Sequence, residues 1–201
     1  MNFERMFCVF LPICLLANPM IETKIDDNKN KESQFEPAKV TSKYYASMDI
    51  SLTYSQFFNH LFHMHSFNGL NFNIDTGWVL GESQNVLVGI ALGGSVGTGG
   101  INGMYGLFPA IKVAGRVLEG RLIPYAKIGA GLEHLPFLFR NKQMNAYGVF
   151  VEGGLFVDIA KGYGMSLAHR YLFGRMQGLP LNVHNSSLML GFSFYDFDLS
   201  W

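Results

Sequence analysis

From Tyr44 onward, apolar residues alternate with small or polar residues in one segment after another. In "YASMDISLTY", for example, Met48, Ile50 and Leu52 fall on one side, and serine, aspartate and threonine residues fall on the other. A period of two residues is that of a β-strand, whose successive side chains point to opposite faces. The pattern predicts eight strands, within residues 45–54, 69–80, 86–94, 106–120, 122–134, 147–159, 165–173 and 187–194.

The segments between these strands alternate in length. The links "GESQN", "LEG" and "AKGYG" are short, whereas "SQFFNHLFHMHSFN", "GSVGTGGINGMY", "HLPFLFRNKQMN" and "GRMQGLPLNVHN" are long. Short turns at one end, long loops at the other and an even number of strands are typical of bacterial outer-membrane barrels. The sequence therefore predicts an all-β fold, an eight-stranded antiparallel up-and-down transmembrane β-barrel.

The residues opposite the apolar faces decide which face points inward. They include many glycines beside a few charges, where strands facing water would carry lysine, glutamate and threonine. Small residues with isolated charges suit the crowded interior of an eight-stranded barrel, so we expect the apolar faces to contact lipid. A soluble lipocalin-like barrel or a β-sandwich is the alternative. Aromatic residues near the strand ends fit interfacial girdles: Tyr44, Tyr54, Trp78, Tyr105, Tyr147, Tyr163, Tyr171 and Phe173.

The chain finishes on "SSLMLGFSFYDFDLSW", an apolar alternating segment that suits the closing strand of a barrel. Such a strand must pair with the first one so that no edge remains unpaired in lipid. Phe192, Phe194 and Trp201 are the candidate signal for the barrel-assembly machinery. The phase set by Leu188 to Phe194 puts Tyr195 and the following aromatics on the other face. This predicts a bulge near Phe194 or an extension at the interface.

The first part of the chain has a different composition. An apolar run, "MFCVFLPICLLA", predicts an export signal peptide over residues 1–18, although an ordinary hydrophobic helix remains an alternative. Residues 19–42 are polar and poor in aromatics, which predicts a flexible periplasmic spacer before a barrel over residues 43–201. Both cysteines lie in the predicted signal peptide, so the mature chain would have neither a disulfide nor a thiol nucleophile. A formal net charge of +0 gives no argument for nucleic-acid binding.

Three segments, "LIPYAKIGAGLEH", "VEGGLFVDIAKGYGMSLAHRYLFG" and "HNSSLMLGFSF", resemble the last strands of the OmpA-like, porin-like outer-membrane barrel proteins. The resemblance covers about half of the chain and implies architecture and a bacterial outer-membrane location more than an activity. No counterpart of the family's peptidoglycan-binding domain follows the predicted barrel.

Charged residues on the predicted inner face are the first candidate for function. Charges in a narrow interior must be paired, so we expect a cross-strand ion-pair network that plugs the lumen, with Arg170 at its centre because its fork can serve two carboxylates. A gated ion path is the other interpretation. The predicted network consists of Asp49, Asp75, Lys112, Arg116, Lys127, Glu133, Glu152, Asp158 and Arg170.

Two other motifs give weaker support for a functional site. His60, His63 and His65 are close enough to share a metal, but no carboxylate or cysteine accompanies them in the motif. Outer-membrane lipid A deacylases also resemble the chain at "HRYLF", yet their His-x-Ser-Asn after the Arg-Tyr pair is missing after Arg170 and Tyr171.

The sequence therefore predicts an exported barrel without an enzyme site, a metal or a cofactor, and with a structural or surface-interaction role. Expected partners are outer-membrane lipid and lipopolysaccharide, the barrel-assembly machinery and an unknown ligand at the long loops, but no nucleic acid. A lipid A-modifying enzyme and a soluble lipocalin-like ligand carrier are the alternatives.

Overall fold

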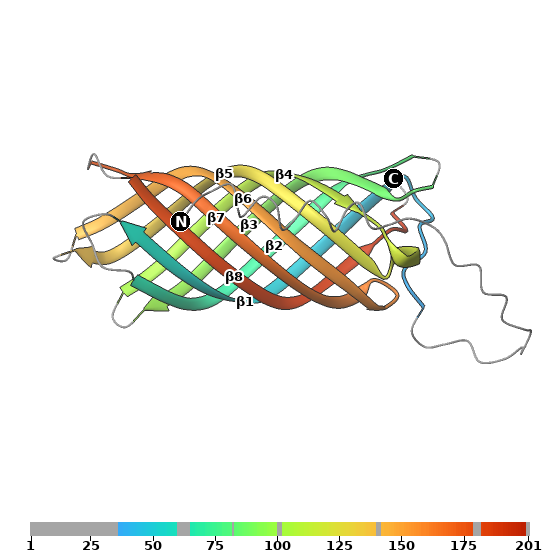
Figure 1. Cartoon of the computed structure of the whole chain (residues 1–201), viewed down its shortest axis with the longest axis horizontal. Coiled ribbons are helices and arrows are strands. Elements are labelled where there is room, and N and C mark those ends of the chain that lie inside the picture. The colour runs from blue at the N-terminus through green and yellow to red at the C-terminus, as the bar shows by residue number, and fades with distance from the viewer. Residues whose placement is uncertain are drawn as a thin grey trace, which may run out of the picture. The chain divides into compact units, whose positions relative to one another are not determined.

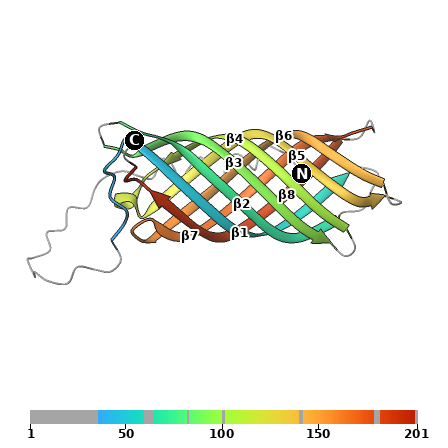
Figure 2. The same ribbon diagram turned by 180° about the vertical axis from the view of Figure 1, so that it is seen from behind.

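The chain forms a closed antiparallel β-barrel in which each strand pairs with the next and β8 pairs with β1 (Figures 1 and 2). The computed structural model describes residues 36–59, 65–81, 83–99, 102–139, 142–178 and 182–199. The predicted fold class is confirmed. The strands are β1 Tyr44–Asn59, β2 His65–Leu80, β3 Val86–Gly99, β4 Asn102–Gly115, β5 Leu122–Phe139, β6 Lys142–Ala160, β7 Tyr163–Met176 and β8 Asn182–Asp196.

The pairing of the strands is staggered around the barrel. A row of partners that starts at Tyr44 passes through Trp78 on β2 and returns to β1 at Tyr54, higher on the same strand. This stagger inclines the strands at about 40° to the barrel axis, within the range of closed barrels, and the inclination is visible in Figure 1. An eight-stranded barrel of this kind has room inside for side chains and for little else.

The apolar faces of the strands point outward. Met48, Ile50, Leu52 and Phe192 are exposed, with 73% of the surface of Phe192 accessible, whereas their neighbours Ser51 and Ser193 are buried. This confirms the predicted orientation and contradicts a soluble lipocalin-like barrel, whose outer face would be polar. Among the described residues, no helix is long and apolar enough to cross a membrane.

Outward aromatic side chains border this apolar surface at both ends. We call Tyr44, Trp78 and Tyr163 the inner aromatic row, and Tyr54, Tyr105, Tyr147 and Tyr171 the outer aromatic row. Along β1, the rise of an inclined strand from Tyr44 to Tyr54 is about 25 Å, which matches the apolar band of outer-membrane barrels. The end of the barrel beyond the inner aromatic row is the terminal end, and the opposite end is the outer end.

The strands are longer than the alternation predicts, and the expected long loops are mostly strand. β3 and β4 are separated by residues 100–101 alone, and β5 and β6 by residues 140–141 alone. The prediction of four long loops is therefore wrong. Beyond the apolar band both faces of a hairpin meet polar surroundings, so the period-two signal fades while the backbone pairing continues.

The closing strand keeps its phase to its end. Tyr195 and Phe197 are buried and face the lumen, where Tyr195 stacks near Phe156 with ring centroids 4.7 Å apart. The prediction of a bulge near Phe194 is therefore wrong, because β8 pairs regularly with both neighbours through this region. The aromatic side chains change from lipid-facing to lumen-facing because the apolar residues change parity in the sequence.

Part of the expected spacer lies against the terminal end. Ala38 N donates to the Asp158 carboxylate at 2.8 Å, and the Arg116 guanidinium donates to Ala38 O at 2.8 Å. Ser42 N also donates to Phe197 O, beyond the end of β8, at 2.9 Å. Burial lowers the pKa of the Arg116 guanidinium, and the Asp158 charge opposes this shift. Residues 36–42 therefore belong with the barrel, while residues 1–35, with the predicted signal peptide, lie outside the described residues.

The β6–β7 hairpin shows why the turns at the terminal end are tight. Lys161 and Gly162 both have positive φ, 49° and 90°. Two successive positive φ values are the mark of a type I′ turn, whose twist matches that of the flanking strands. A Cβ on Gly162 would also lie 2.0 Å from Tyr195 O, so this position requires glycine.

An arginine in the middle of the apolar band tests the membrane orientation. Ile50 lies midway along β1 between Tyr44 and Tyr54, and Ile50→Arg should lower the free energy of unfolding in lipid vesicles by about 2–4 kcal/mol. The matched control is Thr98→Arg, because Thr98 is outward and exposed at the outer end of β3. Equal stability of the two variants in denaturant titrations would contradict the assignment of the band.

A second substitution tests the contact of residues 36–42. Arg116→Ala removes the donor to Ala38 O, so hydrogen exchange of the amides in residues 36–42 should become about fivefold faster, as expected for one lost hydrogen bond. Arg121→Ala, in the same turn but exposed, serves as the control. Unchanged exchange in the Arg116 variant would show that this hydrogen bond does not hold the segment.

Candidate functional site

The interior of the barrel is the candidate functional site, and it is filled in three layers. An apolar cluster closes each end, and charged and polar side chains lie between them. The terminal cluster consists of Tyr45, Val79, Leu87, Ala114, Ile123, Phe156, Tyr195 and Phe197, with Ala38 and Val40 packed against it. The outer cluster consists of Phe57, Phe67, Met104, Leu135, Met144, Ala146, Met176 and Val183.

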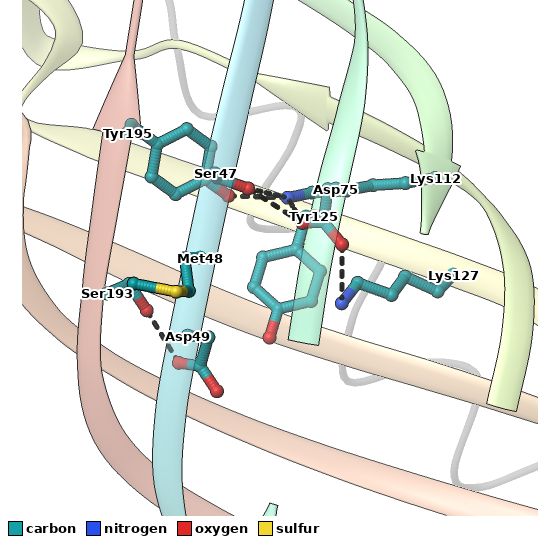
Figure 3. Close-up of a pocket in the computed structure, with 9 residues that line it drawn as sticks. All are labelled: Ser47, Met48, Asp49, Asp75, Lys112, Tyr125, Lys127, Ser193 and Tyr195. Carbon is teal, nitrogen blue, oxygen red and sulfur yellow. Dashed lines mark hydrogen bonds and ion pairs between the residues drawn. The ribbon is translucent and has the colours of Figure 1, made fainter. Parts of the chain in front are cut away.

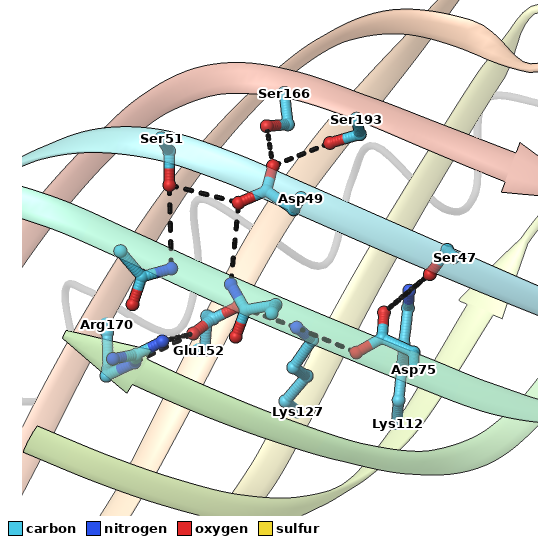
Figure 4. A network of polar contacts seen from close by, with 12 residues as sticks. Ser47, Asp49, Ser51, Asp75, Lys112, Lys127, Glu152, Ser166, Arg170 and Ser193 are labelled. Atoms are coloured by element: carbon cyan, nitrogen blue, oxygen red, sulfur yellow. Dashed lines mark hydrogen bonds and ion pairs between the residues drawn. The ribbon is translucent and has the colours of Figure 1, made fainter.

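Five of the predicted lumen charges form one continuous chain of ion pairs (Figure 4). Lys112 pairs with Asp75, and Lys127 Nζ lies 3.3 Å from both Asp75 Oδ1 and Glu152 Oε1. Arg170 then contacts Glu152 Oε2 through Nη2 at 2.7 Å and through Nε at 2.8 Å. All five side chains are nearly inaccessible, so the chain of charges is shielded from solvent.

The register of the strands explains this order. Lys127, Glu152 and Arg170 are direct partners on β5, β6 and β7, which alternates the sign of charge across neighbouring strands. Lys112 is the direct partner of Lys127 on β4, and two like charges opposite each other are unfavourable. Asp75 removes this conflict, because its carboxylate reaches from β2 to both ammonium groups.

Asp75 and Glu152, rather than Arg170, therefore link the ion pairs to one another. Each of Asp75 and Glu152 contacts two cations, whereas Glu152 is the one carboxylate that ion-pairs with Arg170 among the described residues. The remaining space around Arg170 is aromatic, since its guanidinium lies 3.9 Å from the centroid of Phe108 and 5.3 Å from that of Phe150. Arg170 is thus held by two contacts to one oxygen of Glu152 and by cation–π packing.

Small residues on the inner face make room for these groups. A Cβ on Gly93 would lie 2.5 Å from Asn73 Oδ1 and 3.4 Å from a guanidinium nitrogen of Arg170. A Cβ on Gly154 would lie 2.4 Å from the ring of Tyr125, which packs within 5.0 Å of the Lys112 ammonium. The inward glycines are therefore needed because larger side chains from other strands occupy the same lumen.

The other four predicted charges lie elsewhere. Asp49 accepts hydrogen bonds from Ser166 and from Ser193, the latter at 2.6 Å, and has no described cation within ion-pair distance. Glu133 is buried and accepts a hydrogen bond from the Asn185 amide. Arg116 and Asp158 lie at the terminal end, where both bind the backbone of Ala38.

Several residues of the site were not predicted from the sequence. Tyr195 Oη accepts a hydrogen bond from Lys112 at 2.6 Å, although the assumed bulge had placed this residue outside the lumen. Serine and asparagine side chains complete the middle layer, and their alternation with apolar residues on β1 was the available signal. Those that form side-chain hydrogen bonds are Ser47, Ser51, Ser55, Asn71, Asn73, Ser166, Asn185, Ser187 and Ser193.

Figure 3 shows the residues that line one cavity of the middle layer. A cavity of about 10 Å³ lies among residues that include Asp49, Asp75, Lys112 and Tyr195. A single water needs roughly 10–15 Å³ measured in this way, so the cavity has no room for a solute.

The remaining candidate residues fall outside this site. His60 and His63 lie outside the described residues, and His65 begins β2 at the outer end. Among the residues that the structure describes, no group of three metal-ligating side chains is close enough to hold an ion. Phe192 and Phe194 point outward on β8, and Trp201 lies outside the described part of the chain.

Comparison with solved structures identifies the architecture. Ail, the attachment invasion locus protein of Yersinia pestis, matches with a TM-score of 0.53 and 12% sequence identity over 76% of this chain and 99% of Ail. Neisserial surface protein A matches with a TM-score of 0.52 and 14% identity over 76% of this chain and 97% of that protein. The chain has the fold of the eight-stranded outer-membrane β-barrel proteins. No protein-family model and no curated protein sequence matches it.

The fold and the outward apolar band together place the barrel in a bacterial outer membrane. A closed barrel satisfies its backbone hydrogen bonds internally, as lipid requires, and the exposed leucine, isoleucine, valine and phenylalanine side chains would be unfavourable in water. Sequence identities of 12% and 14% to the solved structures show a shared fold alone.

Neutralising Glu152 tests whether the ion pairs hold the barrel together. Glu152→Gln leaves Lys127 and Arg170 without this buried carboxylate, so the free energy of unfolding should fall by about 3–5 kcal/mol. Glu119→Gln is the matched control, because Glu119 lies in the short 3₁₀ helix η1 (Leu118–Gly120) and is exposed. The same denaturation midpoint in both variants would mean that the ion pairs add nothing to stability.

Proposed function

We propose that the protein is a non-enzymatic outer-membrane barrel whose lumen is closed and whose function lies at its outer surface. The observation that carries this proposal is the filled interior, with an apolar cluster at each end and paired charges between them. A path for solutes would need a continuous opening, and the cavity beside Asp75 and Lys112 has a volume of about 10 Å³.

The outer end supplies the surface for interaction. All four hairpins extend beyond the outer aromatic row as paired strands, so they present a firm rim instead of the long loops that we had expected. The solved structure of Ail includes a complex with the heparin analogue sucrose octasulfate, a polyanion. This supports a comparable role for the rim of the present chain in binding a surface partner.

The charges at the outer end favour an anionic partner. Residues 55–72, 92–109, 134–151 and 171–194, which make up the outer parts of the strands and their links, contain no aspartate or glutamate. With the links included, these residues contain Arg140, Lys142 and Arg175 as well as five histidines. Lipopolysaccharide is anionic, and a rim free of carboxylates can approach it without repulsion.

Export and assembly complete the proposal. Residues 1–18 would direct export and residues 19–35 would remain as a periplasmic spacer. The outward Phe192 and Phe194, with Trp201, would be recognised by the barrel-assembly machinery. A lipid A deacylase remains the alternative function, and lipid A mass spectrometry of cells with and without the gene distinguishes the two, because a deacylase changes the acyl-chain number.

Planar-bilayer recording tests the closed lumen. The wild type should show no large, steady conductance, and Arg170→Ala should conduct more often, because removing the guanidinium opens space beside Phe108 and leaves Glu152 with one cation fewer. Arg175→Ala, which changes an outward-facing arginine on the same strand, should behave as the wild type. A large and steady wild-type conductance would instead make the protein a small channel.

A further inference from the structure

One side of the barrel carries polar side chains on the surface that faces lipid. His169 Nε2 and Ser186 Oγ are 2.9 Å apart and join β7 to β8. Gln56 Nε2 donates to Tyr54 Oη at 2.9 Å, and Tyr54 Oη lies 3.1 Å from Ser66 Oγ, which joins β1 to β2. Because Ser186 is the direct partner of Gln56, these five residues form one continuous patch, which we call the polar stripe.

The other side of the barrel carries hydrogen-bonded polar side chains only at and beyond the outer aromatic row, where His134 Nδ1 and Asn145 Oδ1 are 2.7 Å apart and Asn145 Nδ2 donates to Gln177 Oε1 at 2.7 Å. On β3 to β6, the outward residues next to the outer aromatic row are Val96, Leu107, Leu132 and Val149, all of them apolar and exposed. Leu107 and Leu132 also line a shallow apolar hollow of about 320 Å³, together with Pro109, Ala130 and Tyr147. What distinguishes the polar stripe is His169, which lies below the outer aromatic row, where the outward residues of β3 to β6 are apolar.

The polar stripe begins inside the apolar band. A row of direct partners leads from Tyr54 through Leu188 to His169, and His169 lies below Tyr171 of the outer aromatic row on its own strand. An ionisable side chain that faces the membrane interior is unfavourable, and it usually marks a functional site. Its direct partner on β6 is Gly153, which has no side chain, so one edge of the imidazole is left uncovered.

The depth and the charge of the stripe limit what can bind there. It lies at the outer edge of the apolar band, where acyl chains join the polar part of a lipid. It offers an imidazole, two hydroxyls, a phenol and an amide, but no lysine or arginine, so it suits neutral hydrogen-bonding groups better than phosphate.

We propose that the polar stripe binds the acyl-linkage region of an outer-leaflet glycolipid through its amide groups and hydroxyl groups. His169 and Ser186 would exchange part of their mutual hydrogen bond for bonds to these groups, while Leu188 and Leu190 contact the acyl chains. This proposal rests on the proposed function only in taking the outer end of the barrel as the end that meets the outer leaflet.

Native mass spectrometry of the folded, full-length protein in detergent tests the proposal, with lipid A as the probe. The wild type should retain one lipid A, and the double variant His169→Leu/Ser186→Ala should retain it with about tenfold lower affinity, as expected for the loss of one or two hydrogen bonds. Ser187→Ala is the matched control, because Ser187 is adjacent but points into the lumen and bonds Ser55. Its affinity for lipid A should equal that of the wild type.

Two further lipids define the recognised group. Monophosphoryl lipid A should show the same loss in the double variant, because the stripe has no cation for phosphate. Phosphatidylethanolamine, which has no amide-linked acyl chain, should bind equally to the wild type and the double variant. The proposal would be overturned if the double variant lost no affinity for monophosphoryl lipid A, or if it lost as much affinity for phosphatidylethanolamine as for lipid A.

Folding is checked separately by heat-modifiable migration in detergent gels. If the double variant does not fold, Ser186→Ala and Gln56→Leu replace it, each with an expected loss of several fold. Equal lipid A retention in all folded variants would contradict the proposed binding site without affecting the proposal of a closed barrel. A steady wild-type conductance would contradict the closed barrel without affecting the proposed binding site. Removal of an acyl chain by the wild type would overturn simple binding and indicate hydrolysis.

Discussion

The pairing of β1 with β8 is the constraint on which the rest of the structure depends. In lipid no water is available to unpaired backbone groups, so the sheet must close on itself. Closure with eight inclined strands sets a narrow interior, and every side chain that does not face lipid must fit there. The apolar outer surface and the crowded, polar interior are therefore two results of one backbone requirement.

The narrow interior makes charge pairing a matter of register. Lys112 and Lys127 face each other on β4 and β5, a placement that repulsion would disfavour if Asp75 did not reach both from β2. Glu152 likewise lies between Lys127 and Arg170 on three successive strands. A shift of one strand by one residue would turn these side chains toward lipid, so the buried ion pairs also oppose misregistered pairing.

The proposed closure of the interior leaves the outer surface as the part of the protein that meets partners. The apolar clusters at the two ends, and residues 36–42 bound at the terminal end, leave no described path through the barrel. The outer surface, in contrast, is uneven, with His169 and Ser186 hydrogen-bonded at the edge of the apolar band on one side and an apolar hollow on the other. An uneven surface can bind one lipid more tightly than another, whereas a uniform apolar band has the same contacts for all lipids.

Alternation along single strands predicted the strand number, the links between the strands predicted the antiparallel order, and the glycines opposite the apolar faces predicted that Asp75, Lys127 and Glu152 point into the lumen. Alternation did not determine the strand ends, because pairing continues where both faces are polar, nor the inward turn of Tyr195. Only the tertiary structure decided which cation meets which carboxylate, and that His169 meets Ser186. These contacts join residues of different strands, and their distances depend on the stagger at which the barrel closes, which no single strand encodes.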